Sequence, residues 1–251
     1  MNLNRASGID VSHWKPILDF RALKSSDVSF VGVKATEGHS YVDPAFEAHR
    51  KGIRQNGFSL GIYYHFARSG NPIAQAEWFA KTVGKLEENE RVCLDLEVVP
   101  VLDDVASSSK NPRAAVNWVT RFYDVLFERY PDRRPLIYTS KRIWRMLAPE
   151  GLAPEGLAPE GLAPEGLAPE GSEGDSWKYA PRVDLWAPRY NDHGIAPSLP
   201  APWAKAGWTI WQWSDGDFPP KITPGVGRCD VNWFRSDKLA LENYAKERRI
   251  D

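Results

Sequence analysis

The sequence predicts an α/β protein with a single, irregular TIM-like (β/α) barrel. The chain has 251 residues, and its short apolar segments alternate with longer segments of helical pattern. α/β barrels of this length commonly form one domain, and strands that alternate with helices indicate a parallel sheet of βαβ units. Eight strand candidates match the number in a barrel, but the last three lack clear intervening helices. We therefore expect one irregular barrel over residues 1–251.

The strand candidates are short runs that are rich in apolar residues. In chain order they span residues 8–11, 30–35, 60–66, 92–97, 135–138, 183–187, 209–213 and 230–233.

Three segments between these strands carry helix start signals. Each opens with Asp or Asn followed by Pro, which is a good N-cap followed by a good first helical residue. The predicted helices run from Asp43 to about Asn56, from Asn71 to about Leu86, and from Asn111 to about Tyr130. Gly57 is a typical stop signal for the first of them.

One segment interrupts the alternation of strands and helices. Residues 147–171 are five tandem copies of Leu-Ala-Pro-Glu-Gly. A five-residue period matches neither a helix nor a strand, and Pro blocks helix propagation in every copy. We expect a flexible insertion at 147–176 within the barrel domain. It is either an inert expansion of the repeat or a wall-binding or lid element.

Composition and charge exclude several classes of protein. The net charge is −1, so no basic field exists to gather nucleic acid. The two cysteines form no disulfide framework, and no spacing of Cys or His indicates a metal site. We expect a monomer with no metal, no cofactor and no nucleic-acid partner.

The chain shows no targeting segment and no membrane span. It lacks a charged-then-apolar leader at its N-terminus and any run of 18 apolar residues. If the substrate lies outside the cytoplasm, we expect delivery by cell lysis, by a secretion system, or by a leader that has been removed.

Four acidic residues lie where a barrel places its chemistry. Asp10 ends the first strand, Asp95 and Glu97 end the fourth, and Asp230 begins the last. Asp95 and Glu97 are two residues apart on an extended segment, so their side chains point to the same side. Active sites of such barrels lie at the C-terminal ends of the strands, so the four acids are expected to converge there.

Convergent carboxyl groups suit one kind of chemistry in particular. Like charges at close range cannot all ionise easily, so at least one pKa should rise. The raised group can donate a proton while a neighbour stays charged, which is the division of labour that glycoside hydrolysis needs. Leu94, Leu96 and Val98 should point the other way, against the helices. The alternatives are acids that cap helices or form ion pairs, and a two-carboxylate metal site, although no His lies beside the motif.

Aromatic residues at the strand ends are consistent with binding of sugar rings. They are Tyr64, Tyr138, Trp186, Tyr190, Trp211 and Trp213. In the segment 211–213, alternation sends both Trp to one side and Gln212 to the other, and the pattern leaves open which side faces the barrel mouth. Core packing is the alternative role for Trp186 and for one Trp of this segment.

These motifs together resemble the glycoside hydrolase family 25 lysozymes, the Chalaropsis type. The resemblance spans residues 8–240 apart from the repeat. It rests on seven segments in order: Gly8-Ile9-Asp10-Val11-Ser12, Lys34-Ala35-Thr36-Glu37-Gly38, Tyr64-His65-Phe66-Ala67-Arg68, Asp95-Leu96-Glu97, Leu185-Trp186-Ala187-Pro188-Arg189-Tyr190, Trp211-Gln212-Trp213 and Asp230-Val231-Asn232.

The resemblance implies an irregular β/α barrel that cleaves the β-1,4 bond between N-acetylmuramic acid and N-acetylglucosamine in the glycan strand of bacterial peptidoglycan. It implies Glu97 as the general acid and Asp95 as its assisting carboxylate. Asp10 and Asp230 match two further acids of the catalytic site. The substrate-binding residues that we infer are Tyr64, Tyr138, Trp186, Tyr190, Gln212, Trp213 and Glu37.

Two features depart from the family pattern. The repeat is not a family feature, and we recognise no wall-binding module after residue 240. Two alternatives to a muramidase stay open: a catalytically silent glycan-binding barrel, and another glycosidase such as a chitinase-like enzyme.

Overall fold

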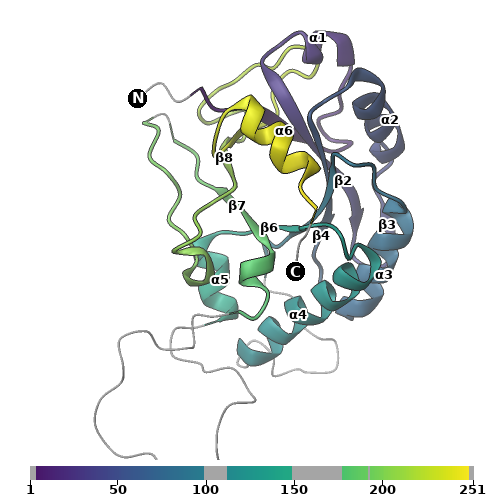
Figure 1. Ribbon diagram of the computed structural model, residues 1–251, viewed down its shortest axis with the longest axis vertical. Coiled ribbons are helices and arrows are strands. Elements are labelled where there is room, and N and C mark those ends of the chain that lie inside the picture. Colours follow the sequence, from purple (N-terminus) through teal and green to yellow (C-terminus); the bar gives the residue numbers. More distant parts are fainter. Residues whose placement is uncertain (1–3, 99–111, 149–176, 192, 249–251) are drawn as a thin grey trace, which may run out of the picture.

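Eight strands close into a barrel because the first strand, β1, pairs with both β2 and the last strand, β9. The computed structural model describes residues 4–98, 112–148, 177–191 and 193–248 (Figure 1). The strands are β1 (Ser7–Val11), β2 (Val28–Glu37), β3 (Tyr41–Val42), β4 (Leu60–Phe66), β5 (Glu90–Asp95), β6 (Leu136–Tyr138), β7 (Asp184–Pro188), β8 (Ile210–Ser214) and β9 (Asp230–Phe234).

The order around the barrel is β1-β9-β8-β7-β6-β5-β4-β2, and β3 is a short addition to the edge of β2. All eight predicted strands are present, which confirms the barrel. Pairing is parallel from β1 through β2 and on to β8, whereas β9 is antiparallel to both of its neighbours. An antiparallel partner needs no crossover helix, which explains the expected irregularity at this end of the chain.

Helices surround the barrel and lie across one of its ends (Figure 1). They are α1 (Phe20–Lys24), α2 (Phe46–Asn56), α3 (Pro72–Val83), α4 (Pro112–Arg129), α5 (Lys141–Leu147) and α6 (Lys238–Lys246), with short 3-10 turns at Ala180–Arg182 and Ala201–Trp203. None of the helices within the described ranges is both long and apolar enough to cross a bilayer.

The predicted helix boundaries hold in part. Asn71 caps α3 as expected, by accepting from the backbone amides of Ile73 and Ala74. Gly57 ends α2 with a positive φ of 64°. The predicted start of α2 at Asp43 was too early, because the helix begins at Phe46. Asp43 lies just before it, where its Oδ1 accepts from the backbone amide of Ala45 at 2.9 Å and its Oδ2 lies 2.8 Å from His13 Nδ1.

Two other helix predictions differ from the structure or fall outside it. α3 ends at Val83 rather than Leu86, because Gly84 adopts a positive φ of 61°. Asn111 lies outside the described residues.

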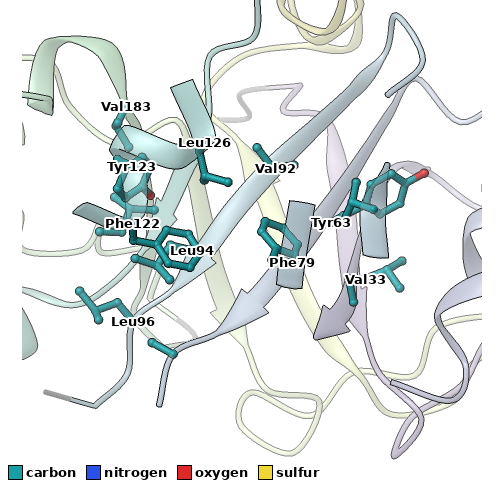
Figure 2. Close-up of a cluster of buried hydrophobic side chains, with 14 of the residues drawn as sticks. Val33, Tyr63, Phe79, Val92, Leu94, Leu96, Phe122, Tyr123, Leu126 and Val183 are labelled. Carbon is teal, nitrogen blue, oxygen red and sulfur yellow. The ribbon is translucent and has the colours of Figure 1, made fainter. Parts of the chain in front are cut away.

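Two apolar layers position the site. Between the strands and the helices, Val33, Val92 and Leu94 of the sheet face Phe79 of α3 and Phe122 of α4 (Figure 2). This layer anchors the strands that carry the predicted acids.

The second layer fills the barrel. Phe30, Ile62 and Leu136 pack inside it with Leu241 and Tyr244 of α6. α6 therefore closes the end of the barrel where the parallel strands begin, and the opposite end, where they finish, is left for a cavity.

We predict that Phe79→Ala destabilises the fold by about 3–5 kcal/mol, since it removes a fully buried ring that packs against His65 and Phe122. Chemical denaturation measures this. The exposed neighbour Glu77→Ala is the matched control and should stay within about 0.5 kcal/mol of the parent. Equal stability of the two variants would contradict this description of the core.

Candidate active site at the barrel mouth

A cavity of about 180 Å³ lies at the C-terminal ends of the parallel strands. All four predicted acids line it, as do five of the seven residues predicted to bind substrate. Its lining is Asp10, Ser12, Lys34, Tyr64, Phe66, Asp95, Glu97, Tyr138, Trp186, Tyr190, Gln212 and Asp230.

Alternating burial along the end of β5 places the side chains of Asp95 and Glu97 on the same side of the chain. Leu94 and Leu96 are fully buried, so Asp95 and Glu97 face the cavity. The backbone amide of Leu96 donates to the carbonyl of Tyr138 at 2.8 Å, which keeps the chain extended beyond the last residue of β5. Asp95 is only 7% exposed, whereas Glu97 is exposed at the mouth. Val98, expected to point against the helices, is exposed instead.

Burial and mutual repulsion favour a retained proton on this pair of carboxyl groups. Burial, the charge of Glu97 and the charge of Asp10 raise the pKa of Asp95 well above its ordinary value. Desolvation and the charge of Asp10 also raise the pKa of Glu97, which shares a hydrogen bond with Asp95. Two carboxyl groups can share a hydrogen bond only when one is protonated. The site therefore contains a proton donor above the usual carboxyl range.

Lys34 is the cation of the cavity. Its charge opposes the rise in the pKa of both Asp95 and Glu97. No role for Lys34 was predicted from the sequence. The position of Lys34 near the C-terminal end of β2 could have indicated that it lies at the barrel mouth.

Asp10 is held by two amide groups. Its Oδ2 accepts from Asn232 Nδ2 at 2.7 Å and from Gln212 Nε2 at 3.0 Å. Trp186 Nε1 donates to Asn232 Oδ1 at 2.8 Å, and an indole can only donate, so the amide nitrogen of Asn232 must face Asp10. Burial raises the pKa of Asp10, and the two amide hydrogen bonds oppose that rise.

Gln212 is fixed by two tyrosines. The hydroxyls of Tyr138 and Tyr190 donate to its Oε1 at 2.7 and 2.8 Å. The cavity wall is thus a connected polar network, which holds Asp10 in one orientation.

Tyr64 and Trp186 complete the wall and floor of the cavity. Tyr64 donates to the carbonyl of Val11 at 3.2 Å, and its ring meets Trp186 edge-on at 6.5 Å. Trp186 is nearly fully buried, so it both packs the barrel and lines the cavity.

Two residues predicted to bind substrate do not line this cavity. Alternation along β8 points Gln212 inward, so Trp213 points out and stacks on Trp233 with ring centroids 4.9 Å apart. Glu37 forms ion pairs with Lys34 and Arg68, both at 2.5 Å. Glu37 does not line the cavity itself, but it binds Lys34, which does.

Asp230 faces Asp10 across the pair β1–β9. Burial and the charge of Asp10 raise its pKa to about 8, while Lys15 opposes the rise. A carboxyl with a raised folded-state pKa stabilises the fold below its unfolded value of 3.8, and this contribution is lost as pH rises through about 8.

We predict that Asp230→Asn reduces the loss of stability with rising pH, because the amide cannot ionise beside Asp10. At pH 8 the variant should be more stable than the parent by at least about 1 kcal/mol, measured by denaturation from pH 4 to 9. Asp27→Asn, at an exposed position, is the control. Identical pH slopes for Asp230→Asn and the parent would contradict the buried-charge explanation.

Comparison with known proteins identifies the family of this chain. The sequence profile of the glycosyl hydrolases family 25 matches residues 9–153, more than half of the chain. Lysozyme M1 of Streptomyces globisporus is 26% identical over 250 residues, which cover 94% of this chain and 71% of that protein.

Two solved structures share the fold over nearly their full length. The bacterial lysozyme from Streptomyces coelicolor superposes with a TM-score of 0.73 at 25% identity, over 96% of this chain and 97% of that one. The muramidase from Acremonium alcalophilum gives 0.70 at 29% identity, over 96% and 99%. With the family profile matched over most of the barrel and all four acids gathered at its mouth, this chain belongs to glycosyl hydrolases family 25.

Proposed function

We propose that the protein is a peptidoglycan hydrolase, a muramidase that cleaves the β-1,4 bond between N-acetylmuramic acid and N-acetylglucosamine. The observation that carries the proposal is the cavity that gathers the pair Asp95–Glu97 with Asp10 and Asp230, where the pKa of both members of the pair is raised. Membership of family 25 supports a glycoside hydrolase, and the relatives named as lysozymes and muramidases support peptidoglycan as its substrate.

Unequal exposure supports different roles for the two carboxyls. A general acid must reach the glycosidic oxygen, and Glu97 is the exposed member of the pair. Glu97 therefore donates the proton to the leaving oxygen. Asp95 lies behind it, and one of its oxygens has no hydrogen-bond partner in the described part of the chain. Asp95 assists, by steering the acetamido group of the substrate or by stabilising positive charge on the sugar.

Asp10 sets the protonation of the pair, and Asp230 lies opposite Asp10 across β1 and β9. The charge of Asp10 raises the pKa of both Asp95 and Glu97. Tyr64, Tyr138, Tyr190 and Gln212 then shape the wall that contacts the sugar, with Trp186 as its floor. Lys34 joins this set, with Glu37 holding its ammonium group. The enzyme acts on the bacterial cell wall as a monomer.

We also propose one catalytic domain with an inserted repeat. Leu147, in the first copy, is the fully buried last residue of α5. After the repeat, the ring of Trp177 lies 5.6 Å from that of Trp144 in α5. The two described flanks of the insertion therefore lie close together on the outer layer of the barrel domain, and residues 149–176 themselves lie outside the described residues.

We predict that Glu97→Gln lowers the release of reducing ends from purified peptidoglycan by about 10²–10⁴-fold without changing the stability, because the amide cannot donate the acid's proton. The exposed Glu77→Gln is the control and should keep full activity. Full activity of Glu97→Gln would exclude Glu97 as the acid.

Mass spectrometry of the soluble products from the same assay separates the alternatives. Muramic acid at the reducing end supports the muramidase, whereas glucosamine there supports a chitinase-like enzyme. Binding to walls without any release of reducing ends supports a silent glycan-binding barrel.

We predict a bell-shaped pH dependence of kcat/KM. Activity falls at high pH as the pair loses its shared proton, and at low pH as the remaining carboxylate is protonated. Asp10→Asn should move the alkaline limb to lower pH, because the charge of Asp10 raises both pKa values. Lys34→Gln should move it to higher pH, because Lys34 lowers them. Shifts of the same sign in both variants would contradict this electrostatic account.

A further inference from the structure

The central cavity is smaller than its proposed substrate. Its volume of about 180 Å³ is below the roughly 300–1,000 Å³ of typical ligand pockets, so a glycan strand must extend over the lips of the cavity. On one side a second hollow of about 290 Å³ shares Glu97, Tyr138 and Tyr190 with it. That hollow lies over β5, β6 and β7. The opposite lip, over β1, β2 and β3, is the other place where sugar rings can bind.

An exposed tryptophan lies on this opposite lip. Trp14 is 80% exposed and follows two residues after Ser12, which lines the cavity. The next residue, Lys15, lowers the pKa of both Asp10 and Asp230 by its charge, so the segment Ser12–Lys15 runs along the rim of the acid cluster.

The indole is exposed but firmly supported. Its ring packs on that of His13, with centroids 4.5 Å apart. His13 Nδ1 lies 2.8 Å from Oδ2 of Asp43, whose side chain is fully buried. Tyr41 of β3 approaches the same nitrogen, with its hydroxyl 3.3 Å from Nδ1.

The backbone around Trp14 is equally constrained. The amide of Lys15 donates to the carbonyl of Ser12 at 3.1 Å, and Lys15 Nζ donates to the carbonyl of Asp215 at 2.9 Å. Further along, the amides of Leu18 and Asp19 both donate to the carbonyl of Gly225. A pre-positioned aromatic face loses little conformational entropy on binding, which favours a role in recognition.

We propose that Trp14 is a sugar-stacking residue that binds one pyranose ring of the glycan strand on the β1–β3 side of the cleavage point. The inference rests on the proposed glycan substrate. The apolar C–H face of a pyranose matches the indole, and Tyr41 with Lys34 connects this platform back to the cavity, since Lys34 Nζ lies 5.9 Å from the Tyr41 ring. Trp14 acts in binding and takes no part in proton transfer.

The test uses glycan strands from which an amidase has removed the peptides, and compares the parent with Trp14→Ala, Trp14→Phe and Leu18→Ala. Leu18 is a matched control, because it is also 80% exposed and lies in the same loop. Trp14→Ala should raise KM roughly three- to tenfold with kcat unchanged, Trp14→Phe should restore most of the loss, and Leu18→Ala should match the parent.

A second readout does not depend on turnover. In a Glu97→Gln background, peptide-free strands should protect a tryptophan from quenching by acrylamide, and adding Trp14→Phe should remove this protection. Parent-like KM for Trp14→Ala would overturn the inference, as would a defect confined to peptide-bearing walls, which would assign Trp14 to the peptide stem. If the parent protein releases no reducing ends while the glycan still protects Trp14 from quenching, the proposed activity is contradicted but the binding role of Trp14 is not.

Discussion

Four carboxyl groups share one poorly solvated cavity, and the rest of the structure depends on this constraint. Asp10, Asp95, Glu97 and Asp230 come from three strands that meet because the barrel closes between β1 and β9. Like charges cannot all persist at such short range. Burial raises the pKa of every member, and the charge of neighbouring acids raises the pKa of Asp95, Glu97 and Asp230 further. A site that retains protons near neutral pH is the physical requirement for acid-assisted cleavage of a glycosidic bond.

The environment of each acid then separates their roles. Asp10 accepts two amide hydrogen bonds that oppose the rise in its pKa, whereas Asp95 has one oxygen without a partner in the described chain. Glu97 combines a raised pKa with exposure at the mouth. The buried members therefore tune the charge, and the exposed member is free to reach the substrate. The hydrogen bonds of Gln212 and Asn232 fix the orientation of both amide groups, and this keeps the environments of the four acids distinct.

Much of the architecture was predictable from local pattern, because apolar strands and Asx-Pro helix starts are short-range signals. Asn71 caps its helix as its sequence predicted. Asp43 also accepts from a backbone amide at a helix start, but its helix begins later than predicted, and its carboxylate has a second, long-range partner in His13 that local sequence cannot show. The short α1 and α5 and the two-residue β3 carry too few residues for a periodic pattern. Alternation correctly separated Gln212 from Trp213 but could not tell which side faced inward. The inward side of β8 depends on its register with β7 and β9, a tertiary property.

The most direct test of the account is a ¹³C NMR titration of the aspartate and glutamate side-chain carboxyls from pH 4 to 9, with Asn and Gln variants used to assign the signals. The account predicts that the Asp95–Glu97 pair still holds its shared proton above the ordinary carboxyl range and that Asp230 titrates near a pKa of about 8. Titration of all four acids near their ordinary values of 3.8 and 4.5 would contradict it.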